Sequence, residues 1–238
     1  MIGAMTKIGT NQRVHTCTEL PSGVHHWYLE PGSQLYLLHE QRTSDEINTQ
    51  ITFVLGAGSS LTYMPIITHS GHITITFQLA EYSSAQVNGA YVLNAKQKIS
   101  LITRQEHSGK NSSSSLCING VATGAAVVEY TGMIAIQEHA IRSQAHQENK
   151  TLLLSSQASA VSIPSLEVLT NDVQCGHGSA VGPLQKEHLI YAQSRGISLL
   201  QAKHLLITSY FAQTLHGILD KAVRQEIIKR LVDKALGE

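Results

Sequence analysis

The sequence carries no net charge, because lysine plus arginine and aspartate plus glutamate each number 17 in 238 residues. Proteins that bind nucleic acid or anionic membrane surfaces need a basic field to attract phosphates, so we expect no nucleic acid and no membrane among the partners. Long apolar runs are also missing, and stretches such as Thr151–Leu154 are far too short to cross a bilayer. The first residues lack the layout of a secretion signal, which predicts a cytoplasmic location.

Cysteine is scarce as well. Only Cys17, Cys117 and Cys175 occur, far apart and without a Cys-x-x-Cys pair. Such an odd and sparse set does not make a disulfide framework, which favours reduced thiols in a cytosol.

Recognisable catalytic signatures are absent from the sequence. There is no Gly-x-Ser-x-Gly elbow, and the glycine-rich stretch Gly56–Ser60 is not followed by the Gly-Lys-Ser/Thr of a phosphate-binding loop. No feature marks a pair of carboxylates of the kind that glycosidases use. We therefore predict that the chain is not an enzyme.

Helical periodicity is missing from about residue 20 to residue 175, where short strands are predicted instead. His72–Leu79 alternates polar and apolar residues strictly and is rich in β-branched side chains. The predicted strands are 34–40, 51–55, 61–67, 72–79, 90–93, 99–103, 116–118, 126–130, 133–136, 151–154 and 165–169. Small residues recur at the corners, which suits a stacked β-solenoid. An irregular period leaves a β-sandwich nearly as good a fit.

The pattern changes after Gly182-Pro183. Three amphipathic helices are predicted: one that ends at Arg195-Gly196, one that starts with a capping box at Ser198, and one that starts at Asp220. Such short helices bury little alone and are expected to dock on the body, on a partner, or on both. The predicted organisation is a β core over residues 1–182 and a C-terminal helical domain over 183–238.

Cys175 and His177 lie two residues apart, at the boundary between the two patterns. If the segment is extended, both side chains point to one face, and thiolate plus imidazole makes half of a zinc or iron site. A purely structural role, with Cys175 as a small hydrophobe and His177 in a turn, is the competing interpretation. Further ligands would have to come from elsewhere, for example from another chain.

Four segments resemble the SufB/SufD family of iron–sulfur cluster assembly proteins. Gln144–Ser155 resembles the family's segment that leads into Leu-Leu-Leu-Ser, and Leu189–Ile197 resembles its Phe-Tyr-x-x-Ser-Arg-Gly-Ile helix. Pro164–Val168 and Asn171–Gly182 are similar to its Pro-x-Leu-Glu and Asp-Val-x-Cys-Ser-His-Gly-Ala-Thr-Val-Gly signature. The Cys-x-His-Gly form resembles SufD more than SufB, in a short form that lacks the family's N-terminal helical region.

The resemblance implies a mainly β fold, with a right-handed parallel β-helix core and a small C-terminal helical domain. It implies a scaffold that works with a SufB-like paralogue and a SufC-like ABC ATPase. A transient iron–sulfur cluster would form at the partner interface on His177, with Cys175 beside it, and none would be bound stably by this chain alone. The ATPase would dock on the C-terminal helices, where the expected contacts are Leu205, Tyr210, Leu215, Ile228 and Leu231.

Two alternatives remain open from the sequence. One is a β-solenoid metal-dependent or carbohydrate-active enzyme that uses surface carboxylates and histidines. The other is a homodimer of this chain in isolation, with a purely structural role.

Overall fold

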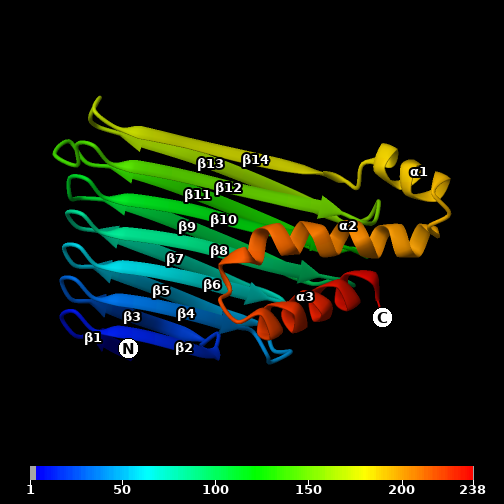
Figure 1. The fold of residues 1–238 in the computed structure, drawn as a ribbon, viewed down its shortest axis with the longest axis horizontal. Coiled ribbons are helices and arrows are strands. Elements are labelled where there is room, and N and C mark those ends of the chain that lie inside the picture. The colour runs from blue at the N-terminus through cyan, green and yellow to red at the C-terminus, as the bar shows by residue number, and fades with distance from the viewer. Residues whose placement is uncertain (1–3, 238) are drawn as a thin grey trace.

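The computed structural model describes residues 4–237 and consists of a β-solenoid followed by three helices (Figure 1). The chain alternates between two seven-stranded parallel sheets, so that each coil adds one strand to each sheet. Sheet A holds the odd-numbered strands: β1 (Ala4–Ile8), β3 (Gly23–Leu29), β5 (Ile47–Leu55), β7 (Gly71–Leu79), β9 (Lys98–His107), β11 (Val127–Ile136) and β13 (Ser159–Val168). The predicted solenoid is confirmed, and the sandwich is not observed.

Sheet B holds the even-numbered strands. They are β2 (Arg13–Glu19), β4 (Gln34–Glu40), β6 (Ser60–Ile67), β8 (Ser84–Leu93), β10 (Ser113–Ala122), β12 (Gln144–Leu153) and β14 (Gln174–Pro183). The spacing between stacked residues varies along the chain, from 21 residues (Ala4 beside His25) to 32 (Val127 beside Ser159). This drift explains why the repeat looks irregular in the sequence.

The main core fills the space between the sheets, where alternate residues of every strand point inward. Trp27, Phe53 and Phe77 occupy one inward column; the rings of Phe53 and Phe77 stack with centroids 5.5 Å apart. In the next coil the column becomes polar, because Gln105 stands beside Phe77, and Gln105 Nε2 donates to Gln147 Oε1 at 3.4 Å.

These inward polar residues explain the errors in strand prediction. Gln147 and Asn149 are fully buried, so the inward face of β12 is polar and only its last residues look like a strand in the sequence. The strands predicted at 126–130 and 133–136 are one strand, β11, in which Gly132 interrupts the apolar pattern. A Cβ at Gly132 would lie 2.1 Å from Gln147 Nε2, so glycine here makes room for that amide. The strands β1 and β2 were not predicted.

The C-terminal helices are α1 (Lys186–Ser194), α2 (Leu199–Thr214) and α3 (Lys221–Leu236), with the short 3-10 turn Leu215–Gly217 between the last two. Ser198 and Gln201 form the predicted capping box, and Asp220 caps α3. The helices α2 and α3 pack on the outer face of sheet B and form a second core there (Figure 1). No helix among residues 4–237 is long and apolar enough to cross a membrane.

Two histidines inside the solenoid should make its stability depend on pH. His39 and His107 are buried, and desolvation lowers the pKa of each to about 4. Each stays neutral in the folded state, whereas it takes up a proton near pH 6.5 when unfolded. Their contribution is therefore complete above pH 6.5 and is lost as the pH falls towards 4.

We predict a loss of about 2 kcal/mol per histidine in the free energy of unfolding between pH 7.5 and pH 5. Urea titration at the two pH values measures it. His107→Gln should remove part of this pH dependence, and His146→Gln, at an exposed position, should leave it unchanged. A wild-type free energy of unfolding that is the same at both pH values would contradict the prediction.

Candidate functional site

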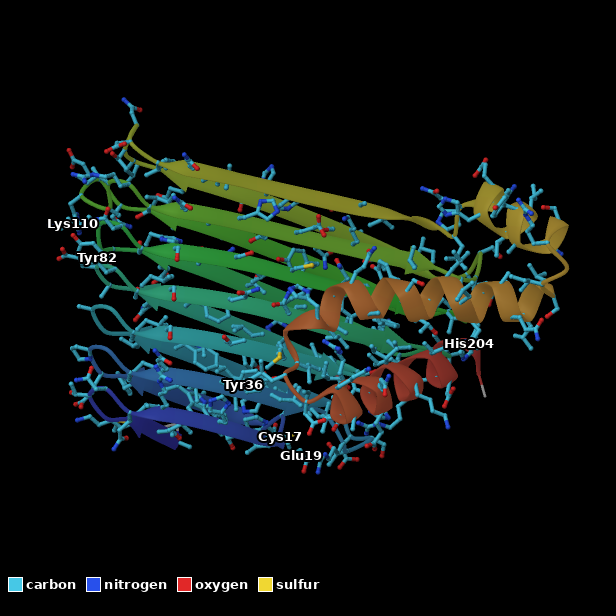
Figure 2. The ribbon with its side chains drawn as sticks, viewed as in Figure 1. Cys17, Glu19, Tyr36, Tyr82, Lys110 and His204 are labelled. Atoms are coloured by element: carbon cyan, nitrogen blue, oxygen red, sulfur yellow. The ribbon has the colours of Figure 1, made fainter. Side chains whose placement is uncertain are left out.

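The strands β13 and β14 form the last coil of the solenoid and are the edge strands of their sheets (Figure 1). No further coil covers them in residues 4–237, so one side of each strand leaves its backbone N–H and C=O groups without ladder partners. Figure 2 shows Cys17 and Glu19 at the opposite end of the solenoid, by β2.

Cys175 and His177 both lie in β14, whose extended backbone brings them onto one face, as expected. Cys175 pairs in register with Ala145, and His177 with Gln147, and both of these β12 residues are buried inside the solenoid. The thiol and the imidazole therefore extend inward-facing columns of the core. They are exposed only because no later coil covers them.

Apolar residues make up most of the remainder of this end, where Ser162 and Ser179 are the inward residues that carry hydroxyl groups. Leu166 and Val168 stand in register with the buried Ile134 and Ile136, so they too face the interior side, yet they remain 39% and 37% exposed. Val181 lies in the corresponding inward column of β14 and is 41% exposed. We call these three residues with Cys175 and His177 the open end of the solenoid.

The opposite end has a different character. Its inward positions in β2 are Val14, Thr16 and Thr18, and the charged residues Arg13 and Glu19 lie at the ends of the same strand. A larger share of the inward residues is apolar at the β13–β14 end than in β2, and an end on which apolar residues predominate is the more favourable protein interface. The contrast identifies the β13–β14 end as the candidate interface.

The arrangement offers two metal ligands and no more. Among residues 4–237, no three histidine, cysteine or carboxylate side chains converge. An iron atom at Cys175 and His177 would need further ligands from another chain or from the cluster's own sulfide. Two buried polar atoms of the neighbouring strand β12, Gln147 Nε2 and Asn149 Oδ1, have no hydrogen-bond partner. The interior next to Cys175 and His177 is therefore polar.

Cys117 has the opposite properties from Cys175. It is half-buried on the outer face of sheet B, where burial and the neighbouring Glu148 carboxylate raise the pKa of its thiol to about 11. Asn119 Nδ2 donates to its sulfur at 3.2 Å. At neutral pH this thiol stays protonated, so it is a poor nucleophile and a poor ligand.

The predicted ATPase contacts separate into two groups. Leu205 is 52% exposed on α2, whereas Leu215, Ile228 and Leu231 are buried against the outer face of sheet B. The phenolic group of Tyr210 also faces the body and donates to Lys150 O at 2.7 Å. Direct contact of a partner with the three buried residues would require α2 and α3 to detach, so the structure does not support that part of the prediction.

An exposed apolar patch lies on the helices; one member, Leu205, was predicted from the sequence and the other four were missed. It comprises Ile190, Tyr191, Leu199, Leu200 and Leu205, which we call the α1–α2 patch. Leu199 and Leu200 stand in the first turn of α2, ahead of the residues that the helix buries, which are Ala202, Ile207, Phe211 and Thr214.

A shallow groove of about 590 Å³ crosses sheet B over several coils. Its lining consists of hydroxyl, amide, imidazole, thiol and small apolar residues, with no aspartate or glutamate among the described residues. Because glycoside hydrolysis requires two carboxylates, this groove gives no support to the carbohydrate-active alternative.

Comparison with known proteins decides the family. Residues 7–210 match the family model described as SUF system FeS cluster assembly, SufBD core domain. The chain belongs to the SufBD family. The match spans the solenoid from residue 7 and reaches into α2, so it covers the open end and all of the α1–α2 patch.

Within this family the chain lies close to SufD. It is 30% identical over 108 residues to the iron-sulfur cluster assembly protein SufD of Escherichia coli, which is 45% of this chain and 26% of that protein. It is 29% identical over 133 residues to SufD of Bacillus subtilis, or 56% and 30%. The match to SufD of Plasmodium falciparum covers 91% of this chain at 24% identity but 14% of the relative. The aligned regions thus span less than a third of these relatives.

Proposed function

We propose that this SufBD-family chain is a SufD-like scaffold, without catalysis of its own, in the cytoplasm. It would assemble iron–sulfur clusters together with a SufB-like paralogue and a SufC-like ABC ATPase. The observation that carries the proposal is the placement of Cys175 and His177 in the inward columns of an uncovered, apolar solenoid end.

The open end suits a paralogue with the same fold. A second solenoid brought end to end would cover Leu166, Val168 and Val181 with its own inward side chains. It would also offer its edge strands to the unpaired backbone groups of β13 and β14, the mode known as β-strand addition. A chain of unrelated fold would have to satisfy these backbone groups in some other way.

Such pairing would enclose His177 and Cys175 between the two chains. A neutral imidazole can donate a lone pair to iron, and a thiolate is the ligand that iron–sulfur clusters use most. With only two ligands from this side, the cluster is a cargo that the two chains hold together and release. This accords with the prediction that the chain alone holds no stable cluster.

The ATPase would dock on the α1–α2 patch rather than on the buried residues of α3. Leu200 and Leu205 line a shallow hollow with Ile197 on the outer side of α2, where Figure 2 places His204. Because α2 also packs on sheet B, a force applied to the patch would be transmitted to the solenoid through the helix itself.

The cluster site is tested by His177→Ala in the complex produced with SufB-like and SufC-like partners under anaerobic conditions. Since the imidazole is a ligand and not a packing element, we expect the complex to form and its cluster content to fall several-fold. Iron and sulfide analysis with visible absorbance measures the effect.

His146→Ala is the matched control, because His146 lies one strand away on the outer face and its loss should leave the cluster content unchanged. Equal cluster yield from His177→Ala and wild type would overturn the proposed role of His177.

The docking patch is tested by Leu205→Asp. A charge at the centre of an apolar contact should weaken binding of the SufC-like ATPase by roughly thirty-fold or more, without affecting the SufB-like partner. Biolayer interferometry with purified chains measures both affinities.

Val223→Asp provides the control for added charge, since Val223 is an exposed apolar residue on α3 outside the patch. Undiminished ATPase binding by Leu205→Asp, or an equal loss in both variants, would contradict docking at the α1–α2 patch.

A further inference from the structure

A second site lies far from the open end, where α3 crosses the C-terminal ends of β4 and β6 (Figure 1). A cavity of about 410 Å³ is enclosed there by the end of β4, the loop that follows it, the end of β6 and the second half of α3. Basic side chains enter it from both sides: Arg42 and His69 from the solenoid, Arg230 and Lys234 from α3.

The wall of this cavity holds an unsatisfied donor. Gln41 is 3% exposed, and its side-chain oxygen accepts from the backbone N–H groups of Thr68 and His69 at 3.2 and 3.0 Å. These two bonds fix which way the amide points, and its Nε2 is left without a partner. A buried donor without an acceptor is costly, which suggests that something else accepts from it.

Positive charge exceeds negative charge in the same cavity. The single carboxylate, Glu40, is nearly buried and binds Arg230 at 2.6 Å and Arg42 at 3.4 Å. Arg42, Arg230 and Lys234 therefore share the cavity with one carboxylate, in a chain whose overall charge is zero, while Glu226, outside the cavity, lies 4.0 Å from Arg230. Each guanidinium has five N–H donors, so both arginines retain donors beyond those that Glu40 uses.

The surroundings of Lys234 and His69 disfavour the charged forms of both side chains. Desolvation lowers the pKa of Lys234, and desolvation together with the charge of Lys234 lowers the pKa of His69. Lys234 Nζ has one acceptor, Asn94 Oδ1 at 3.4 Å, and could donate two further bonds. A negative ligand between these groups would relieve both costs.

We propose that this cavity binds a phosphate group through Arg42, Arg230 and Lys234, with the Gln41 amide in the wall behind them. A tetrahedral oxyanion offers several acceptor oxygens in different directions, which matches donors that come from a loop and from a helix. The site does not depend on the proposed function, because it uses none of the residues at the open end or in the α1–α2 patch. It ties α3 to the solenoid, so occupancy stabilises the docked position of the helix.

The test uses the isolated full chain. Calorimetric titration with inorganic phosphate, and separately with adenosine monophosphate, distinguishes a free ion from a phosphate ester. Sodium chloride at matched ionic strength serves as the control for general screening. Saturable binding of either ligand, accompanied by a rise in melting temperature, is the expected result.

Two variants locate the site. Lys234→Met keeps the apolar stem and removes one charge, so affinity should fall roughly tenfold or more. Gln41→Glu keeps an oxygen for the Thr68 and His69 amides but puts a negative charge in place of the unpaired donor. It should abolish binding, and the melting temperature of the ligand-free variant separates loss of binding from misfolding.

Lys229→Met is the matched control, since Lys229 lies exposed on the same helix outside the cavity and its loss should leave affinity unchanged. The proposal is overturned if neither phosphate nor adenosine monophosphate binds saturably, or if Lys234→Met and Gln41→Glu bind as tightly as Lys229→Met.

Discussion

The structure depends on the stacking of one coil on the next. Each strand satisfies its backbone through parallel pairing with the coils before and after it, and each inward side chain is covered by the side chain at the same register position. The last coil has a neighbour on one side only. Its apolar side chains, its unpaired backbone groups and the side chains of Cys175 and His177 are thus exposed by one cause, and a single partner of similar fold would cover all three.

The helices extend this arrangement rather than forming a separate body. One face of α2 and α3 covers the outer side of sheet B, where Ile207, Phe211 and Leu231 are fully or almost fully buried. The opposite face of α1 and α2 keeps apolar residues in solvent. The chain therefore has two candidate contact surfaces, one at the end of the solenoid and one on its side, and α2 belongs to both the core and the second surface.

Much of this could be predicted from the sequence, and the failures have physical reasons. Alternation identified strands such as β7, where inward residues are apolar, and missed most of β12, where Gln147 and Asn149 are the inward residues. The common face of Cys175 and His177 was predictable, because side chains two residues apart in one extended strand point to the same side. Which apolar residues of the helices are exposed could not be predicted, since amphipathic spacing shows that Leu231 is on an apolar face of α3 but not whether the solenoid covers that face.

Hydrogen exchange on the complex with a SufB-like partner tests the central claim, that the β13–β14 end is the interface, most directly. The account predicts that amides of β13 and β14 exchange rapidly in the isolated chain and become strongly protected in the complex, while amides of β1 and β2 do not change. Unchanged exchange at β13 and β14, or protection at β1 and β2 instead, would contradict it.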